Sequence, residues 1–167
     1  MTERQKFDLL KKIPGTKVEI RRYHPCVMAD VIVEAPYSQA PSLGFRPLVT
    51  YISKNNIAMT APVLQESTDL SSWIISFVMP AEMKLEDLPN PEGSKVTLRT
   101  LSEQLCASLA FSGITTTAKV QEKEVELRAA LTKEGLTPIG ALRIARFDPP
   151  WKPGILRYNE VILDIKP

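Results

Sequence analysis

Histidine and cysteine are the residues of this chain with the clearest capacity for metal or nucleophilic chemistry. The sequence of 167 residues contains one histidine, His24, and two cysteines, Cys26 and Cys106. A closed zinc site usually takes four Cys or His ligands, so this set is too small for one. Neither cysteine stands in a pattern typical of a Cys–His nucleophile. His24 therefore remains as a single imidazole ligand for a metal, although a turn histidine is usually exposed and inert.

A second candidate site is the proline-rich segment DPPWKPGILRYN at residues 148–159. It places an aromatic side chain, Trp151, directly before a cation, Lys152. Loops that combine aromatic and charged groups often bind ligands. The segment is equally typical of a rigid turn held by its three prolines, because proline restricts the backbone. Both interpretations stay open, and under the first we expect Trp151 and Lys152 to contact the ligand.

A helix with one apolar face is predicted between His24 and the 148–159 segment. Its apolar residues stand at i, i+3, i+4 and i+7, namely Phe45, Leu48, Val49 and Ile52. Pro47 fits the first turn of such a helix, and Arg46 is the cation within it. This face could pack in the core, or it could line a groove. A groove would leave part of the face exposed, and exposed apolar patches tend to mark binding sites.

The two halves of the sequence resemble each other. Val18–Val33 aligns without a gap to Val96–Phe111 at an offset of 78 residues, with apolar positions on apolar positions and Arg21 on Arg99. A self-match of long period predicts a duplicated supersecondary unit. We expect a single domain over residues 1–167, with pseudo-repeats at about 18–80 and 96–165.

Each pseudo-repeat is predicted to be a ββαββ unit. In the first unit, strands at Val18–Tyr23 and Cys26–Glu34 form a hairpin around His24–Pro25, and strands at 59–66 and 73–79 follow the helix. In the second unit, Leu105, Ala107, Leu109 and Phe111 alternate as the apolar face of a strand. A helix then starts at Thr116 or Thr117 and ends near Gly135, and strands at 139–147 and 160–165 follow. The predicted fold class is α+β, a distorted antiparallel β-barrel or curved sheet flanked by two helices.

Composition excludes several classes of protein. The chain is 44% apolar and 24% charged, which is typical of a globular protein, and its net charge of +2 is too small for a nucleic-acid-binding surface. No apolar run approaches the ~18 residues of a membrane span. Residues 1–15 lack a secretory leader and are predicted to form a short amphipathic helix with Phe7 and Leu10 on one side. We therefore expect a cytoplasmic protein with reduced thiols.

Four ordered segments carry a family resemblance. VEIRRYHP at 18–25, IAMTAPV at 57–63, SFVMP at 76–80 and DPPWKPGILRYNEV at 148–161 together resemble the SOUL haem-binding protein family. The resemblance implies the duplicated ββαββ fold, and it implies haem or another tetrapyrrole as a ligand held non-covalently for sequestration or transport. It also implies similarity to the effector-binding domains of the GyrI-like group, which bind small amphiphiles.

The resemblance also implies a set of contact residues. The porphyrin would lie on the first helix, against Phe45, Leu48, Val49 and Ile52. Lys152 and Arg46 would meet its carboxylates. Apart from the resemblance, the loop position of Trp151 makes it a candidate for the border of the groove, and His24 is the one imidazole available to the iron.

Three other functions stay open. The chain could be a GyrI-like binding module in which Glu160 faces the positive charge of an amphiphile. It could be a hydrolase that uses Glu160 and Tyr158, since a buried glutamate with a raised pKa can act as a general base. No second catalytic partner is visible, so we expect no enzymatic activity. The groove could also hold the helix of a partner protein, and the oligomeric state is not indicated.

Overall fold

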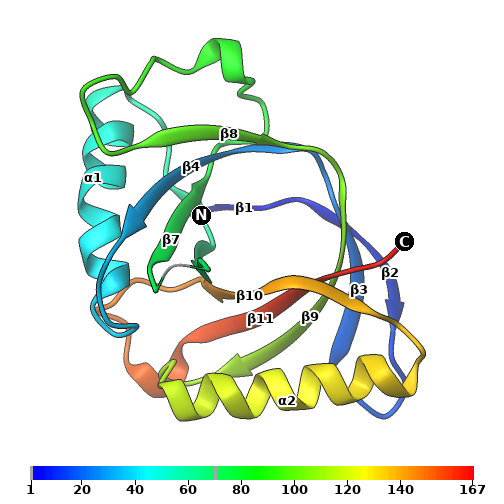
Figure 1. Ribbon diagram of the computed structural model, residues 1–167. Helices are drawn as coiled ribbons and strands as arrows, with labels where there is room; N and C mark the ends of the chain where they lie inside the picture. The colour runs from blue at the N-terminus through cyan, green and yellow to red at the C-terminus, as the bar shows by residue number, and fades with distance from the viewer. Residues whose placement is uncertain (1, 70) are drawn as a thin grey trace.

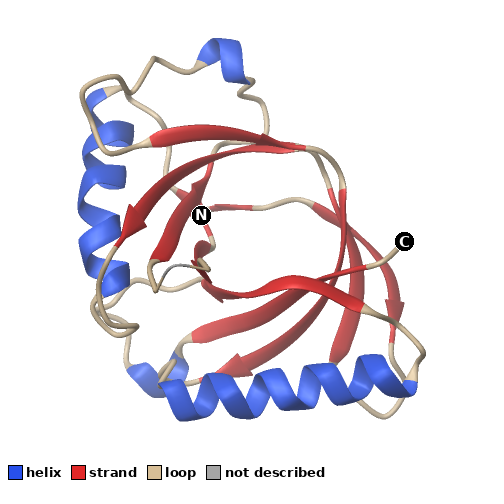
Figure 2. Cartoon of the chain, in the orientation of Figure 1, coloured by secondary structure: helices blue, strands red, loops and turns tan. Residues whose placement is uncertain are grey.

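The computed structural model describes residues 2–69 and 71–167. In these residues the chain forms an α+β fold in which a long antiparallel sheet curls into a half-barrel and two helices cover its outer surface (Figures 1 and 2). The sheet contains β2 (Phe7–Lys12), β3 (Val18–Tyr23), β4 (Cys26–Val33), β6 (Val63–Ser67), β7 (Trp73–Val78), β8 (Thr97–Leu101), β9 (Gln104–Ser112), β10 (Pro138–Arg146) and β11 (Tyr158–Ile165). Two further strands, β1 (Glu3–Arg4) and β5 (Thr60–Ala61), pair in parallel with each other. The predicted α+β class with a curved sheet and two flanking helices is confirmed.

The order of strands across the sheet is β2-β3-β9-β11-β10-β6-β7-β4-β8. Within the described residues β2 and β8 are the two edges, so the sheet curls without closing. The predicted pseudo-repeats match β3 with β8 and β4 with β9. These counterparts occupy mirrored places in the sheet, because β3 lies next to β9 near one edge and β8 lies next to β4 at the other. This order is what two similar units that exchange strands would give, and the duplication itself stays a prediction.

The two helices pack on separate parts of the outer surface. Helix α1 (Ala40–Lys54) lies against β4 and β7, and α2 (Thr117–Lys133) lies against β9, β10 and β11 (Figure 1). Gly44 lets α1 approach the sheet closely, because a Cβ at this position would lie 2.6 Å from the side chain of Ile75. Thr116 caps α2 by accepting a hydrogen bond from the N–H of Lys119, and Gly135 follows the helix at a φ of 73°. The predicted start and end of α2 are therefore confirmed.

Each strand of the half-barrel places alternate side chains outside and inside. Under α2, the outer face of β9 contributes Ala107, Leu109 and Phe111 to the core, and Leu105 packs at its border, as the alternation predicts. The inner face carries a separate apolar cluster, which comprises Tyr23, Met28, Leu64, Val78, Cys106, Ala145 and Ile162. Polar and charged residues share this inner face, and they give the interior its chemistry.

The predicted N-terminal helix is wrong. Residues 3–4 and 7–12 form β1 and β2 instead, and β2 completes the hydrogen bonding of β3 along the sheet edge. The ring of Phe7 lies 5.4 Å from the ring of Tyr23 on β3. Pairing with a strand that lies later in the chain has overridden a weak helical pattern.

The predicted hairpin around His24–Pro25 is also wrong. Strand β3 pairs with β2 and β9, while β4 pairs with β7 and β8, so the two residues form a corner between strands that do not pair with each other. The single strand expected over 59–66 is divided into β5 and β6 at Pro62, which has no N–H to donate to a neighbouring strand. No helix of the described residues is both long and apolar enough to cross a membrane.

Candidate functional site

The predicted contact residues of α1 divide into buried and exposed groups. Leu48 and Ile52 are buried in the core between α1 and the sheet, and Val49 packs at the border of that cluster. Phe45 is 39% exposed, and its ring meets the ring of Phe77 edge-on at 5.4 Å. Arg46 is exposed. A ligand on the surface of α1 would therefore meet Phe45, Arg46 and Val49, whereas Leu48 and Ile52 support the helix from below.

The second predicted segment, residues 148–157, presents apolar side chains to solvent. Trp151 is 83% exposed and Ile155, in the short helix η2 (Gly154–Leu156), is 81% exposed. The segment is internally fixed, because the Nζ of Lys152 lies 3.0 Å from the Oδ1 of Asp148 and Arg157 donates to the carbonyl of Lys152. The segment is tied down, as the rigid-turn interpretation expects, and contact of Trp151 and Lys152 with a ligand stays a prediction.

Tyr37, which precedes α1, is hydrogen-bonded to Arg146, which precedes the 148–157 segment. Its hydroxyl donates to the carbonyl of Thr115 at 2.7 Å and accepts from Arg146, which ends β10, at 3.0 Å. Arg146 also donates to the side chain of Gln65 at 2.8 Å. In Figure 1 the orange and red segment that precedes β11 lies beside the end of α1 where the helix begins. We call the exposed residues Leu43, Phe45, Arg46, Trp151, Ile155 and Leu156, together with the half-exposed Lys152, the α1–loop surface.

Three apolar members of this surface were not singled out from the sequence. Leu43, Ile155 and Leu156 are 52%, 81% and 62% exposed. The pair Ile155–Leu156 was the available signal, since adjacent large apolar residues in a proline-rich loop have no core face to pack against.

His24 lies outside this surface. It occupies the corner between β3 and β4, with its Nε2 3.0 Å from the Oδ1 of Asp8, and its side chain is 45% exposed. Among the described residues, the side chain of His24 forms its hydrogen bond with Asp8 rather than with α1 or the 148–157 segment. Among the residues that the structure describes, no group of three His, Cys, Asp or Glu could hold a metal ion. Ligation of an iron by His24 stays a prediction.

Glu160, the residue considered as a base or a cation partner, is already engaged inside the half-barrel. Its carboxylate oxygens accept from the guanidinium of Arg21 at 2.8 and 3.0 Å, and from the hydroxyl of Tyr158 at 2.5 Å. Burial, together with this hydrogen bond, raises the pKa of Tyr158 to about 12. The positive charge of a guanidinium balances the negative charge of a buried carboxylate. The ion pair with Arg21 therefore gives Glu160 a structural role.

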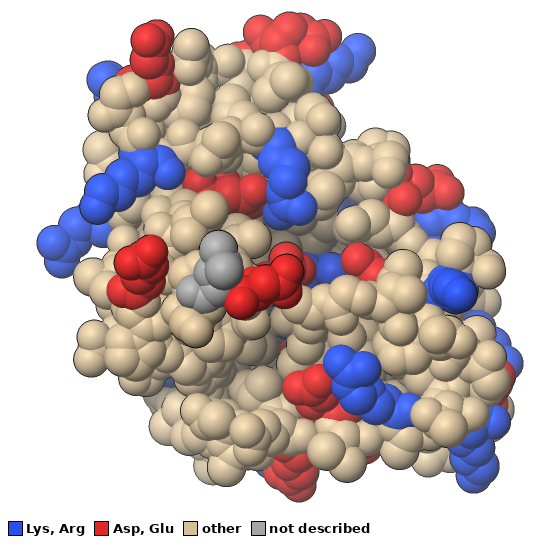
Figure 3. Space-filling model, viewed as in Figure 1, with Lys and Arg blue, Asp and Glu red and all other residues tan. Residues whose placement is uncertain are grey.

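A small cavity of about 220 Å³ opens into the inner face of the sheet. Both arginines that line it are paired, Arg99 with Asp30 at 2.7 Å and Arg143 with Asp164 at 2.9 Å. Glu66 also lines it and forms no ion pair with a described residue, and burial raises the pKa of its carboxyl group. In Figure 3 both signs of charge surround the hollow at the centre of this face. Drug-sized ligands usually occupy about 300–1,000 Å³, so this cavity suits a smaller molecule.

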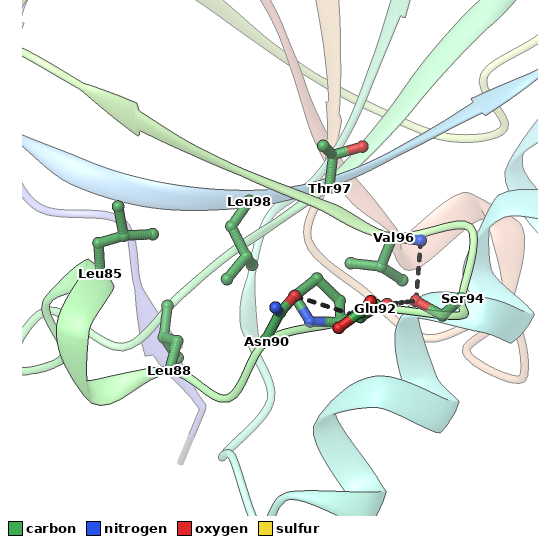
Figure 4. Close-up of a pocket in the computed structure, with 9 residues that line it drawn as sticks. Leu85, Leu88, Asn90, Glu92, Ser94, Val96, Thr97 and Leu98 are labelled. Atoms are coloured by element: carbon green, nitrogen blue, oxygen red, sulfur yellow. Dashed lines mark hydrogen bonds between the residues drawn. The ribbon is translucent and has the colours of Figure 1, made fainter.

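A larger and more open pocket of about 490 Å³ lies between residues 85–94 and β8 (Figure 4). Leu88, Val96 and Leu98 give it an apolar wall, and Glu92 is the ionisable residue among those that line it. The hydroxyl of Tyr51 on α1 donates to the carbonyl of Pro89 and fixes the segment to the helix. The short helix η1 (Leu85–Asp87) belongs to this segment.

Comparison with known structures shows which class of fold this is. The C-terminal domain of EcmrR is similar with a TM-score of 0.69 and 10% identity, over 91% of this chain and 98% of that one. SAV2435 bound to tetraphenylphosphonium is similar with a TM-score of 0.55 and 11% identity, over 90% and 94%. A hydrolase from Listeria innocua is similar with a TM-score of 0.63 and 16% identity, over 92% and 93%. At these identities the likeness shows the fold alone, which is that of the GyrI-like effector-binding domains.

The family is shown by the sequence itself. The family model described as SOUL heme-binding protein matches residues 2–164, so the chain belongs to the SOUL family. None of the curated proteins matches the sequence.

Proposed function

We propose that this protein binds haem or a related tetrapyrrole non-covalently at the α1–loop surface, for sequestration or transport. The observation that carries the proposal is the exposure of Trp151, Ile155 and Phe45 on the 148–157 segment and α1, two elements whose preceding residues Arg146 and Tyr37 are hydrogen-bonded to each other. Exposed apolar side chains gathered on one surface are typical of a binding site. Membership of a family described as haem-binding supports the choice of ligand.

The charges of this surface fit a tetrapyrrole with acidic side groups. Arg46 is exposed and forms no ion pair with a described residue, and the half-exposed Lys152 of the 148–157 segment pairs with Asp148 at 3.0 Å. The pocket beside β8 offers Glu92 instead, which would repel carboxylates. A haem would supply its flat apolar ring and its iron, and these residues would hold the ring by burying apolar area and by pairing with its carboxylates.

Titration with hemin and with iron-free protoporphyrin tests this proposal. We expect saturable shifts of the Soret band for both ligands, and we expect Trp151→Ala combined with Ile155→Ser to weaken binding at least tenfold. This loss reflects about 1.5–3 kcal/mol for each large apolar side chain that leaves the contact. Val125→Ser is the matched control, since Val125 is 69% exposed on α2 and away from this surface, and it should bind as the wild type does.

His24→Ala separates iron ligation from contact with the ring. We expect it to leave protoporphyrin binding unchanged, and a loss of hemin binding alone would assign the iron to His24. Equal affinities in wild type and in the Trp151→Ala/Ile155→Ser variant would contradict the proposed surface, and no saturable binding of either ligand would contradict the function.

A further inference from the structure

Strand β8 is an edge of the sheet that carries few of the features that usually protect an edge. Within the described residues it pairs with β4 in a regular register over Thr97–Leu101, whereas the register of β2, at the other edge, shifts between Leu9 and Lys11. Bulges and charged side chains on an edge strand discourage a further strand from pairing. Three of the six residues of β2 are charged, but β8 carries Arg99 alone, whose charge is paired with Asp30. Of the two edges, β8 is therefore the one at which another strand can add.

The pairing of β4 shows which backbone groups of β8 point away from the sheet. The N–H of Met79 donates to the carbonyl of Val27 at 2.8 Å, so Val27 directs its backbone groups to the β7 side of β4. The direction of hydrogen bonding alternates along an antiparallel strand, so the next residue of β4 faces β8, where it pairs with Arg99. Arg99 therefore faces β4. Its neighbours Leu98 and Thr100 direct their N–H and C=O groups to the open edge.

The pocket beside β8 lies along this open edge. In Figure 1 the segment that contains η1 stands on the side of β8 away from β4. In Figure 4 Leu85, Leu88 and Leu98 lie toward one end of the pocket, and Glu92 lies beside Val96 at the other. Residues that pair across two strands place their side chains close together on the same face. A strand added to β8 would therefore place alternate side chains in the pocket, next to Leu98.

The wall of the pocket opposite β8 is held in place and is acidic. The hydroxyl of Tyr51 holds this segment to α1, and the hydroxyl of Ser94 donates to the carbonyl of Pro91 at 2.6 Å. A wall that is already ordered loses little conformational freedom when a ligand binds. Residues 82–92 contain one lysine and four carboxylates, those of Glu82, Glu86, Asp87 and Glu92. This negative charge favours a partner with basic side chains.

We propose that the open edge of β8 binds an extended peptide segment of a partner protein. The segment adds a strand to the sheet, places apolar side chains in the pocket and directs basic side chains to its acidic wall. Hydrogen bonds with the main chain of Leu98 and Thr100 supply affinity, and the pocket supplies specificity. The inference is independent of tetrapyrrole binding, because it concerns a different surface and a ligand of opposite charge.

Hydrogen exchange in the presence of a capped peptide, Lys-Thr-Val-Thr-Val-Thr-Lys, tests the pairing. As a strand, this peptide presents its lysines and valines on one face in either direction of the chain. We expect saturating peptide to slow exchange of the amides of Leu98 and Thr100 by about tenfold or more, because a paired amide exchanges only when the pairing opens. The amide of Arg99 already bonds to β4 and should change little. A peptide with glutamate in place of both lysines should bind about fivefold more weakly, since the acidic wall repels it.

Two substitutions of Thr100 separate its backbone from its side chain. Thr100→Pro removes the outward N–H and keeps the pairing with β4, because an edge strand tolerates proline where the N–H faces solvent. It should weaken binding of the lysine peptide about two- to tenfold, the effect of one backbone hydrogen bond. Thr100→Val keeps the N–H and should bind as the wild type does. Fluorescence anisotropy of the labelled peptide measures both affinities, and thermal unfolding shows that each variant is folded.

Three results would each overturn the proposal. The first is unchanged exchange of the Leu98 and Thr100 amides at a saturating or the highest soluble concentration of the lysine peptide, a measurement that needs only the wild-type protein. The second is equal affinity of the folded Thr100→Pro and Thr100→Val variants. The third is equal binding of the lysine and glutamate peptides.

Discussion

Arg21→Met is expected to destabilise the protein by about 3–5 kcal/mol, because it leaves the carboxylate of Glu160 buried without its positive partner. Both groups are buried, with side chains 6% and 3% exposed, and their closest atoms are 2.8 Å apart. The hydroxyl of Tyr158 would remain as a partner of Glu160, but a neutral donor does not balance a buried charge. Urea unfolding of the variant measures this loss.

Two further variants identify the cause of the stability loss expected for Arg21→Met. Arg22→Met is the matched control, since Arg22 is 43% exposed and pairs on the surface with Glu103, where an ion pair contributes about 0–1 kcal/mol. The double variant Arg21→Met/Glu160→Gln removes the stranded charge and should recover much of the lost stability. If Arg21→Met were no more destabilising than Arg22→Met, the ion pair would not support the interior as described.

Leu48→Ala is expected to lower the free energy of unfolding by about 2–5 kcal/mol, the range for deleting a fully buried leucine side chain. Leu48 is 0% exposed and lies in the core that joins α1 to the sheet. Leu43→Ala removes the same atoms from a side chain that is 52% exposed on the same helix, and it should change stability by only about 0.5 kcal/mol. Thermal and urea unfolding of the two variants make the comparison, and equal effects would contradict the orientation of α1.

This expectation shows what helical periodicity can and cannot predict. The spacing of Phe45, Leu48, Val49 and Ile52 correctly indicates a helix with one apolar face. It does not indicate what covers that face, because a core and a ligand groove select the same apolar side chains. The structure places the sheet over Leu48 and Ile52, and it leaves Phe45 at the border.

Sequence patterns that span a few residues predicted the helices and strands better than they predicted which strands pair. The alternation in β9 and the capping residues of α2 depend on neighbours within a few positions, and both were read correctly from the sequence. The pairing of β3 with β9 and of β4 with β8 joins residues far apart in the chain, so the turn at His24–Pro25 could not reveal it. The same holds for β2, whose strand conformation depends on the free edge of β3.

Single residues of the candidate site could be predicted from the sequence, but the contacts between its distant segments could not. Trp151 and Lys152 were recognisable as an aromatic residue and a cation in a loop, and both lie at or near the surface. The hydrogen bonds near the start of both elements join Tyr37 to Thr115 and to Arg146, and no local pattern connects these residues. The pocket beside β8 likewise forms only when residues 85–94 return to the sheet.

Mapping the amide chemical shifts that iron-free protoporphyrin induces tests most directly whether a tetrapyrrole binds at the α1–loop surface. We expect saturable shifts concentrated at residues 43–49 and 151–156, with little change in 85–98 or along the inner faces of β6 and β11. Shifts concentrated in the pocket beside β8 or in the inner cavity, or no saturable shifts, would contradict binding at this surface.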